Sequence, residues 1–368
     1  MAIGRGSLEA VGLDARAPDA AFWRGKRVLL TGHTGFKGGW AALWLASLGA
    51  EVTGFALAPD QRPALFDLAR VSEGIISIEG DLRDADAVRA AVDRARPEIV
   101  LHMAAQPLVR RSIADPAETF ASNVTGTVNL LDAARGRGGL RVVLVITSDK
   151  VYANAGNGAA FREEDRLGGK DPYSASKAAC EIVVGAFRDS YFARAGVRLA
   201  SVRGGNVIGG GDFSQDRIVP DAVRAAEAGT ELVLRHPEAT RPWQHVLDCL
   251  SGYFAYAEAL WMREDVPMAL NIGPRPGEQM AVGPLASRVL EALGAERSWR
   301  HEPAPGSVEM KALSIDPSLA ERTLGWRGAL DTEAAVDWTA EWYRAWRDKS
   351  DMRTATLGQI ARYRAVSP

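Results

Sequence analysis

A tyrosine and a lysine four residues apart, Tyr173 and Lys177, form the most informative short pattern in the chain. Residues with this spacing share one face of a helix. A neighbouring ammonium group lowers the pKa of a phenol, so Tyr173 could take a proton from a substrate hydroxyl near neutral pH. The spacing alone is common by chance, but here it follows a glycine-rich turn, and we predict an acid–base pair.

Three adjacent polar residues, Ser148, Asp149 and Lys150, follow an apolar run that ends at Thr147. In doubly wound parallel sheets the reacting groups lie outside the carboxyl ends of the strands. A hydroxyl can hydrogen-bond to a substrate oxygen, a carboxyl group can donate a proton, and an amine can accept one. A polar turn at the end of a strand is the alternative interpretation.

Three glycines spaced three residues apart, Gly32, Gly35 and Gly38, follow a predicted strand at 27–31 and lead into a helix. Without side chains, the backbone amides and the helix N-terminus can approach a pyrophosphate closely. The turn opens the first strand–helix unit of the chain, where a dinucleotide site belongs. A plain tight turn would not need three such glycines, so we predict a dinucleotide cofactor here.

These residues lie in an alternation of short apolar runs and alanine-rich helical stretches. The runs are apolar throughout, as strands buried on both faces of a parallel sheet should be. The predicted fold class is therefore α/β, with a Rossmann-type doubly wound parallel sheet. The expected strands are 27–31, 51–57, 75–78, 99–103, 142–147 and 199–202, and the expected helices include 39–48, 85–95, 116–135 and 172–195.

Beyond this region the sequence has a Gly-Gly-Gly-Asp run, several prolines, shorter apolar runs and many tryptophans. We therefore predict a nucleotide-binding Rossmann domain over 22–207, with 240–262 returning to it, and a smaller C-terminal substrate-binding α/β part over 208–350. Residues 1–21 and 351–368 are expected to be terminal extensions. No long linker separates the two parts, so they should share one interface.

The charge and cysteine content exclude several classes of function. The chain has 44 lysines and arginines against 46 acidic residues, so it has no overall positive field for nucleic acid or an anionic membrane. Its two cysteines, Cys180 and Cys249, argue against a disulfide framework and fit a reducing compartment. The first residues contain no apolar block of the length of a signal peptide or anchor, so we expect a cytoplasmic protein. The histidines and cysteines show no zinc-ligand spacing, which predicts no metal site.

The glycine turn, the Tyr–Lys pair and their order resemble the extended short-chain dehydrogenases/reductases of the NAD-dependent epimerase/dehydratase group. The spacing G-x-x-G-x-x-G is typical of that family, whereas ordinary dinucleotide-binding enzymes carry G-x-G-x-x-G. Asp81-Leu82 is similar to the family's adenine-contacting pair, and Ala104-Ala105-Gln106 to its segment beside the pyrophosphate and ribose. The resemblance implies an NAD site formed by Gly32, His33, Gly35, Phe36, Lys37, Gly38, Asp81, Leu82, Ala104, Ala105, Gln106, Asn123, Tyr173 and Lys177.

Within this family, Ser148-Asp149-Lys150 resembles the sugar-nucleotide 4,6-dehydratases, in which an acid and a second functional group follow the hydroxyl residue. These enzymes oxidise C4 of a hexose, eliminate water across C5 and C6, and return the hydride to C6. By resemblance, Tyr173 is the base for the C4 hydroxyl and Ser148 polarises that oxygen. Asp149 is then the acid for the departing C6 oxygen, and Lys177 holds the nicotinamide ribose.

Lys150 indicates one branch of these dehydratases. The dTDP-glucose enzymes carry a glutamate there as the C5 base, whereas a lysine is typical of enzymes that act on CDP-glucose, as is the Arg-Pro-Trp-Gln-His-Val run at 241–246. The implied reaction is the dehydration of CDP-glucose in deoxysugar biosynthesis. Lys150 either acts as the base, with its pKa lowered from about 10.4, or stays charged and stabilises an enolate. The implied substrate-binding residues are Gln106, Asn206, Arg217, Arg235 and Arg241.

The choice of cofactor rests on the chemistry more than on the second strand. That strand ends in Phe55-Ala56-Leu57 without the acid that usually binds the NAD ribose, and Asp60 comes late. We expect NAD because a dehydratase reduces its own intermediate and needs no pool of reductant. Relatives pair through two long helices, which match 116–135 and 172–195, so a homodimer is expected.

Two other functions remain open at this point. A UDP-sugar 4-epimerase would use the same Ser148, Tyr173 and Lys177 but would gain nothing from Asp149 or Lys150. A redox sensor or scaffold that binds NAD without turnover would not need the Tyr–Lys pair or the residues at the strand end.

Overall fold

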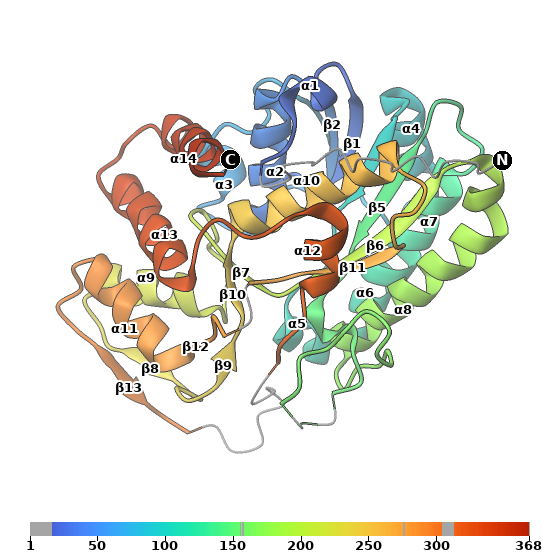
Figure 1. Ribbon diagram of the computed structural model, residues 1–368. Helices are drawn as coiled ribbons and strands as arrows, with labels where there is room; N and C mark the ends of the chain where they lie inside the picture. The colour runs from blue at the N-terminus through green and yellow to red at the C-terminus, as the bar shows by residue number, and fades with distance from the viewer. Residues whose placement is uncertain (1–16, 155, 157, 275–276, 304–312, 368) are drawn as a thin grey trace, which may run out of the picture.

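A seven-stranded sheet in which every pairing is parallel forms the centre of the molecule (Figure 1). The computed structural model describes residues 17–154, 156, 158–274, 277–303 and 313–367, so most of the predicted N-terminal extension lies outside the described residues. The strand order is β11-β6-β5-β4-β1-β2-β3, which confirms the predicted doubly wound sheet with its reversal between β1 and β4. The strands are β1 (Arg27–Thr31), β2 (Glu51–Ala56), β3 (Ile76–Glu79), β4 (Ile99–His102), β5 (Val142–Ile146), β6 (Arg198–Gly204) and β11 (Ala269–Ile272).

The two edges of the sheet differ from the sequence expectation. Strand β11 pairs with β6 and is not predicted by the apolar pattern, because it is only four residues long and contains the polar Asn271. Strand β3 is predicted at nearly the right position, but Ile76 is exposed. An edge strand is not buried on both faces, so its apolar content is a weaker guide to its environment.

Successive side chains of the central strands enter two separate cores, one on each face of the sheet. In β1, Val28 and Leu30 belong to the core that contains α2 (Phe36–Ser47) and α10 (Val246–Met262), whereas Leu29 belongs to the other core, with α4 (Ala85–Ala95). The alternation arises because neighbouring residues of a strand point to opposite faces. Figure 1 shows α10 crossing one face of the sheet while α4, α7 and α8 lie along the other.

The two long helices predicted at 116–135 and 172–195 each contain a π-helical turn. The first comprises α6 (Pro116–Phe120), π-helical η1 (Ala121–Thr125) and α7 (Gly126–Ala134), and the second comprises α8 (Pro172–Phe187), π-helical η3 (Arg188–Phe192) and the 3-10 turn η4 (Ala193–Ala195). In η1 the carbonyl oxygen of Asn123 accepts hydrogen bonds from Thr127 Oγ1 at 2.6 Å and Cys180 Sγ at 3.1 Å. Such side-chain bonds compete with regular helical pairing, and the hydrophobic period of the sequence does not reveal them.

The C-terminal part combines helices with three small two-stranded sheets, β7–β10, β8–β13 and β9–β12. Its elements are β7 (Asn206–Ile208), α9 (Ile218–Ala228), β8 (Leu232–Leu234), β9 (Thr240–Arg241), β10 (Trp243–His245), β12 (Met280–Ala281), α11 (Val282–Ala292), β13 (Trp299–His301), α12 (Ser318–Leu324) and α13 (Thr332–Arg347). Short helices elsewhere are α1 (Ala20–Trp23), α3 (Leu65–Leu68), α5 (Val109–Ala114) and the 3-10 turn η2 (Asp149–Val151). Across the described residues, no helix is both long enough and apolar enough to cross a membrane.

The final helix, α14 (Met352–Val366), packs back against the nucleotide-binding side of the molecule. The ring of Tyr363 lies 5.5 Å from that of Trp44 in α2. Arg353 donates hydrogen bonds to the backbone carbonyls of Arg70 and Glu73. Residues expected as a terminal extension therefore form a packed helix that braces the first strand–helix unit.

Candidate active site

The glycine turn between β1 and α2 has no room for side chains at two of its three glycines. Gly32 has a left-handed backbone conformation, with φ of 83°, and a Cβ atom there would lie 2.8 Å from the backbone of Ala104. A Cβ atom at Gly38 would lie 2.0 Å from the carbonyl oxygen of Gly32. Helix α2 begins at Phe36 and its N-cap, Gly35, provides no capping side chain, which leaves amide groups of the first turn for an anion. This backbone fits the pyrophosphate of NAD.

Asn123 and Gln106 brace the loop after β4. Asn123 Oδ1 accepts a hydrogen bond from the Gln106 N–H at 2.7 Å, and its Nδ2 donates to the Gln106 carbonyl at 3.1 Å and to Ser176 Oγ at 2.9 Å. The Gln106 side chain donates to Thr119 Oγ1 at 2.8 Å. The structure therefore uses the polar groups of both residues to hold the backbone at 104–106, the predicted wall of the cofactor site.

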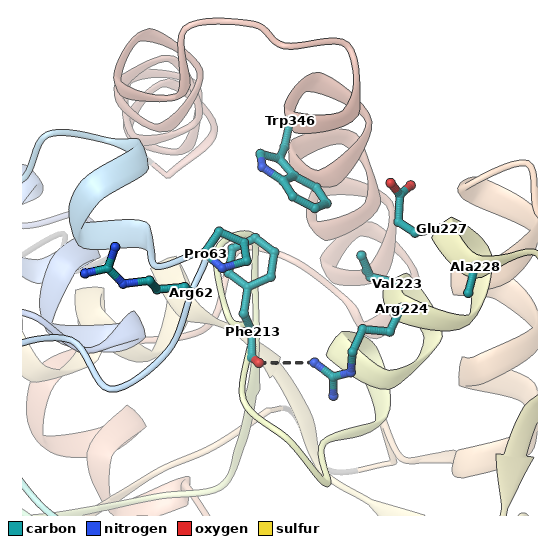
Figure 2. A pocket seen from close by; sticks show the side chains of 8 residues that line it. All are labelled: Arg62, Pro63, Phe213, Val223, Arg224, Glu227, Ala228 and Trp346. Carbon is teal, nitrogen blue, oxygen red and sulfur yellow. Dashed lines mark hydrogen bonds between the residues drawn. The ribbon is translucent and has the colours of Figure 1, made fainter.

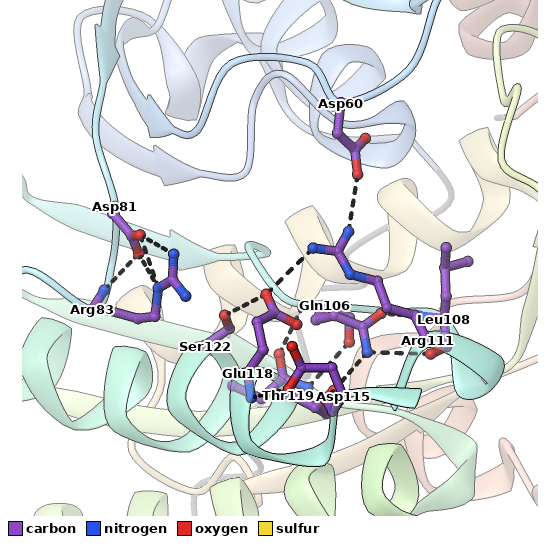
Figure 3. Close-up of polar contacts among 11 residues, drawn as sticks. Asp60, Asp81, Arg83, Gln106, Leu108, Arg111, Asp115, Glu118, Thr119 and Ser122 are labelled. Carbon is purple, nitrogen blue, oxygen red and sulfur yellow. Dashed lines mark hydrogen bonds and ion pairs between the residues drawn. The ribbon is translucent and has the colours of Figure 1, made fainter. Parts of the chain in front are cut away.

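The side chains of two further predicted cofactor residues, Asp81 and His33, form hydrogen bonds within the protein. The Asp81 carboxylate accepts hydrogen bonds from Arg83 Nε at 2.8 Å and from the Arg83 backbone N–H at 2.9 Å, and Arg83 lowers the pKa of this carboxyl (Figure 3). The adjacent Leu82 is buried. His33 is fully buried with Nε2 2.7 Å from Ser77 Oγ, and burial lowers its pKa to about 4. His33 is therefore a neutral residue at physiological pH.

The predicted catalytic residues 148–150 form the start of η2, directly after β5. Ser148 Oγ accepts a hydrogen bond from the Lys150 N–H at 3.2 Å and donates one to Asp149 Oδ1 at 3.1 Å. Asp149 is buried, and within the described part of the chain its Oδ2 has no hydrogen-bond partner. Burial raises the pKa of this carboxyl and outweighs the nearby cations, of which Lys150 acts most strongly. A buried carboxyl with a raised pKa and one free oxygen has the properties of a proton donor.

The phenol of Tyr173 faces this turn, and burial is the largest influence on its pKa. Burial raises the pKa of Tyr173 to about 12, and the hydrogen bond with Ser148 is the strongest effect in the opposite direction. Lys177 Nζ donates a hydrogen bond to the Ile146 carbonyl at 3.0 Å, and burial lowers the pKa of this amine. Burial dominates the phenol pKa in this structure, and the expected effect of Lys177 stays a prediction. The ammonium group of Lys150 lies 5.9 Å from the centroid of the Tyr173 ring.

Two of the predicted substrate-binding arginines lie within electrostatic reach of the catalytic groups. The charge of Arg217 lowers the pKa of Tyr173, and that of Arg241 lowers the pKa of Asp149. Arg217 reaches this position from the residue before α9, and Arg241 from β9. The C-terminal part thus delivers positive charge to the same place as the end of β5.

The other predicted substrate-binding residues of the C-terminal part are Arg235 and Asn206. Arg235 Nη1 is 3.6 Å from Asp216 Oδ1. Asn206 begins β7 and pairs with Trp243 of β10. A Cβ atom at Gly205, directly before Asn206, would lie 3.5 Å from Asp149 Oδ2, so this segment passes beside the catalytic acid.

Residues of the glycine turn approach both α10, in the segment 240–262 predicted to return to the Rossmann domain, and the start of the predicted substrate part at Gly209. Lys37 Nζ donates a hydrogen bond to the Tyr253 hydroxyl at 3.4 Å and lies 5.4 Å from the centre of that ring. The Phe36 ring lies close to the backbone of Gly209, where a Cβ atom would be 3.1 Å away. The predicted cofactor loop and the predicted substrate part are thus in direct contact.

Two ion pairs that the sequence does not predict join α5 to two loops at the carboxyl end of the sheet, and Figure 3 shows the one between Asp60 and Arg111. Asp60, after β2, pairs with Arg111 of α5 at 3.3 Å, and Arg110 pairs with Asp216 at 2.8 Å. Because β2 and β4 lie on either side of β1, the first pair spans the carboxyl end of β1, where the glycine turn begins. We call these four residues the rim. The adjacent arginines are visible in the sequence, but their partners are 51 and 106 residues away.

A cavity of about 400 Å³ lies apart from this site, between the β2–α3 loop, α9 and α13 (Figure 2). None of the predicted site residues lines it. Its walls are formed by Arg62, Pro63, Phe213, Val223, Arg224, Glu227, Ala228 and Trp346. Over the same described ranges, no cluster of three or more histidine, cysteine, aspartate or glutamate side chains could hold a metal ion.

Comparisons with known proteins agree with this geometry. The chain is 41% identical to a CDP-glucose 4,6-dehydratase from Salmonella typhimurium over 355 residues, which cover 95% of this chain and 99% of the relative. A dTDP-glucose 4,6-dehydratase from Xanthomonas campestris is 29% identical over 86% of this chain and 92% of the relative. The solved structure of UDP-glucose 4-epimerase from Thermus thermophilus in complex with NAD matches with a TM-score of 0.74 at 28% identity, covering 86% of this chain and 99% of that one.

A second solved structure connects the fold with dehydration. TunA, described as an NAD-dependent NDP-hexosamine 5,6-dehydratase involved in tunicamycin biosynthesis, matches with a TM-score of 0.71 at 25% identity, covering 87% of this chain and 98% of that one. Residues 28–273 match the sequence model of the NAD-dependent epimerase/dehydratase family. That segment contains the glycine turn, the serine–aspartate–lysine turn and the Tyr–Lys pair, and the chain therefore belongs to the NAD-dependent epimerase/dehydratase family.

Proposed function

We propose that the chain removes water from CDP-glucose to form CDP-4-dehydro-6-deoxyglucose, a step of deoxysugar biosynthesis. The observation that carries the proposal is the turn at 148–150, where a buried acid and an amine follow the serine that contacts Tyr173. Oxidation of a hydroxyl needs one base, whereas elimination of water also needs a group for the C5 proton and an acid for the C6 oxygen. The 41% identical relative from S. typhimurium carries this activity in its name.

The cofactor for this reaction is NAD, which supplies the hydride acceptor for C4 and the hydride donor for C6 when it is bound. The glycine turn offers its backbone amides to the pyrophosphate, and the braced loop at 104–106 forms the adjoining wall. Lys177, on the same helical face as Tyr173, holds the nicotinamide ribose. The buried groups exclude water from the place where the hydride moves.

Tyr173 takes the proton of the C4 hydroxyl. Burial favours the neutral phenol, with a pKa of about 12, and the Ser148 hydroxyl and the Arg217 charge act against burial. These two effects oppose burial but do not outweigh it, since the phenol pKa stays at about 12 with both in place. Ser148 also hydrogen-bonds to the sugar oxygen as it becomes a carbonyl.

Asp149 donates a proton to the C6 oxygen, which leaves as water. Its raised pKa keeps the proton on the carboxyl at a pH where an exposed aspartate would be ionised. As water leaves, the C5–H bond breaks and a C5–C6 double bond forms; bound NAD would then supply the hydride for C6, and C5 would take a proton to complete the product. Lys150 serves this step either as the C5 base or as a cation that stabilises the enolate.

The test is incubation of the purified protein with CDP-glucose, dTDP-glucose, UDP-glucose and GDP-mannose, with and without added NAD. Loss of water is followed by mass spectrometry. Dehydration of CDP-glucose alone is the expected result. Equilibration of UDP-glucose with UDP-galactose without any loss of water would replace the proposal with a 4-epimerase, the activity named for the T. thermophilus structure.

We further propose that the protein acts as a homodimer in the cytoplasm. Four large apolar side chains on the helical layer formed by α5, α6, α8 and η3 are exposed: Ile113 by 49%, Phe120 by 39%, Ile182 by 66% and Tyr191 by 47%. A second copy related by a two-fold axis would cover them. Both cysteines are free and buried, which fits a reducing compartment. Light scattering of the purified protein measures the oligomeric state directly.

A further inference from the structure

We infer that a buried ion pair outside the predicted catalytic residues, Glu181 with Arg203, sets the position of the two halves of the catalytic machinery relative to each other. One half is the turn at 148–150 after β5, and the other is the Tyr–Lys pair on α8. The inference rests on the proposed function, since the rate concerned is that of dehydration. Both residues are positioning residues, because they act through their neighbours.

Glu181 attaches α8 to the start of the catalytic turn. It lies one helical turn beyond Lys177, on the same face, and its side chain is only 4% exposed. Its two carboxylate oxygens accept hydrogen bonds from Nε and Nη2 of Arg203, at 3.1 and 2.9 Å. The carboxylate also accepts hydrogen bonds from the hydroxyl of Thr147 and from a hydroxyl of β6. Thr147 directly precedes Ser148, so one carboxylate holds both the helix and the strand end.

Arg203 attaches the other end of the turn. Its side chain is 5% exposed, and its Nη1 donates hydrogen bonds to the Tyr152 hydroxyl at 2.8 Å and to the Glu163 carbonyl at 2.9 Å. Tyr152 follows η2 directly, and its hydroxyl donates to Asn271 Oδ1 at 2.6 Å. The catalytic turn is therefore tied at one end through Glu181 and at the other through Arg203.

The geometry of this pair matters more than its charge. A guanidinium offers donors in a planar fork that fits a carboxylate, whereas an ammonium group cannot make the same set of bonds. A buried ion pair contributes little net stability, because removing both charges from water offsets most of their attraction. What the pair provides is a fixed distance between β5, β6 and α8, and a displacement of about 1 Å at a catalytic group can cost about 100-fold in rate.

A change in the distance between the catalytic turn and α8 would also alter the pKa of the Tyr173 phenol. The Ser148 hydroxyl is the strongest of the groups that lower the pKa of Tyr173. Asp149, Asp171 and Arg217 are the charged groups with the largest effect on the phenol pKa. The amine of Lys150 lies 5.9 Å from the centre of the ring, and Lys177 lies one helical turn along the same face. None of them bonds to the ion pair. Asp149 and Lys150 would move with Ser148, but they carry opposite charges, so the loss of the Ser148 hydrogen bond should dominate and raise the phenol pKa.

The test compares Arg203→Lys and Thr147→Val with the wild-type protein. Arg203→Lys keeps the charge and loses the fork, so kcat for water loss from CDP-glucose should fall about 100-fold while KM changes less than about threefold. Thr147→Val removes one hydrogen bond to the carboxylate, so kcat should fall about tenfold. In both variants the limb of the pH–rate profile that rises with deprotonation of Tyr173 should move to higher pH.

Asp248→Asn is the matched control, because Asp248 is a buried carboxyl that binds the backbone of Ala329 and the Tyr363 hydroxyl, away from the catalytic turn. It should change the melting temperature and leave kcat and the pH profile unchanged. If Arg203→Lys and Thr147→Val likewise lower only the melting temperature, the pair is merely structural and the inference fails. If Arg203→Lys does not fold, the kcat and the pH–rate profile of Thr147→Val alone test the inference.

The wild-type protein separates this inference from the proposed function. Absence of water loss in the wild-type protein overturns the proposed function. The same variants are then measured on 4-epimerisation, which also uses Ser148 and Tyr173. A wild-type rate and an unshifted pH profile in the variants would overturn the positioning role whichever reaction is observed.

Discussion

The floor of the site and its rim are both held by polar contacts, yet they differ in exposure. We call Ser148, Asp149, Tyr173, Glu181 and Arg203 the floor, and all five are buried. The rim pairs are exposed, with side chains 48% and 67% exposed in Arg111–Asp60 and 54% and 38% in Arg110–Asp216. Burial strengthens interactions between charges and makes the loss of one partner costly, whereas water and salt screen exposed pairs. The chemistry should therefore depend on the floor and tolerate changes at the rim.

The largest effect is expected at the centre of the floor. Asp149→Asn removes the proton donor for the C6 oxygen, so water loss from CDP-glucose should slow by about 100-fold to 10,000-fold, the range of general acid catalysis. Mass spectrometry of the product measures it. Exchange of the C5 hydrogen in deuterated water should persist, because the steps before elimination do not use Asp149. Water loss at the wild-type rate would favour the epimerase alternative and remove Asp149 from the mechanism.

Lys150, next to Asp149 of the floor, tests whether the catalytic turn acts by proton transfer or by charge. Lys150→Met removes both, and dehydration should fall by about 100-fold or more. Lys150→Arg keeps the charge but cannot act as a base near neutral pH. Retained water loss in Lys150→Arg with loss in Lys150→Met would assign the electrostatic role, and loss in both would assign the base. Normal activity of Lys150→Met would contradict any role for this residue.

A third prediction concerns a buried carboxyl outside the floor. Burial raises the pKa of Asp248 from 3.8 to about 7, so the folded protein holds a proton that the unfolded chain releases. Asp248 thus stabilises the fold fully below about pH 4, and the free energy of unfolding decreases as the pH rises to about 7, by up to about 4 kcal/mol. Glu258, raised from 4.5 to about 7, acts in the same direction.

Asp248→Asn cannot ionise and should therefore weaken this pH dependence, leaving the part that Glu258 contributes. Thermal unfolding followed by circular dichroism between about pH 4 and pH 8 measures it. Equal pH dependence in the wild-type and variant proteins would show that Asp248 is not protonated in the folded state. An altered kcat in Asp248→Asn would show that buried polar groups outside the floor also affect catalysis.

The smallest effect is expected at the rim. Asp60→Asn removes the charge that pairs with Arg111, and exposed pairs of this kind contribute about 1 kcal/mol or less. The dissociation constant of NAD should rise by no more than about fivefold, and the difference should shrink at high salt. Titration of intrinsic fluorescence with NAD at low and high salt measures it. A large loss of kcat in this variant would mean that the rim belongs to the catalytic machinery.

Several features of the site were predictable because they depend on local spacing. The glycine spacing predicted a turn without side chains, and the structure confirms that Gly32 and Gly38 have no room for them. The parallel sheet follows from apolar runs that alternate with helical stretches. Strand β11 and the π-helical turn around Asn123 escape this kind of prediction, because a short edge strand and a side-chain-to-carbonyl bond leave no periodic signal.

The sequence by itself determined the order of strands and helices, the cofactor turn and the residue types available for catalysis, because these follow from patterns along a few neighbouring positions. Only the tertiary structure decided which groups become acid, base or brace. Burial raises the pKa of Asp149 and Tyr173, and Glu181 meets Arg203 across 22 residues of chain. Burial and distant partners arise from the packing of whole elements, and packing brings together side chains whose separation along the chain carries no information about their contact.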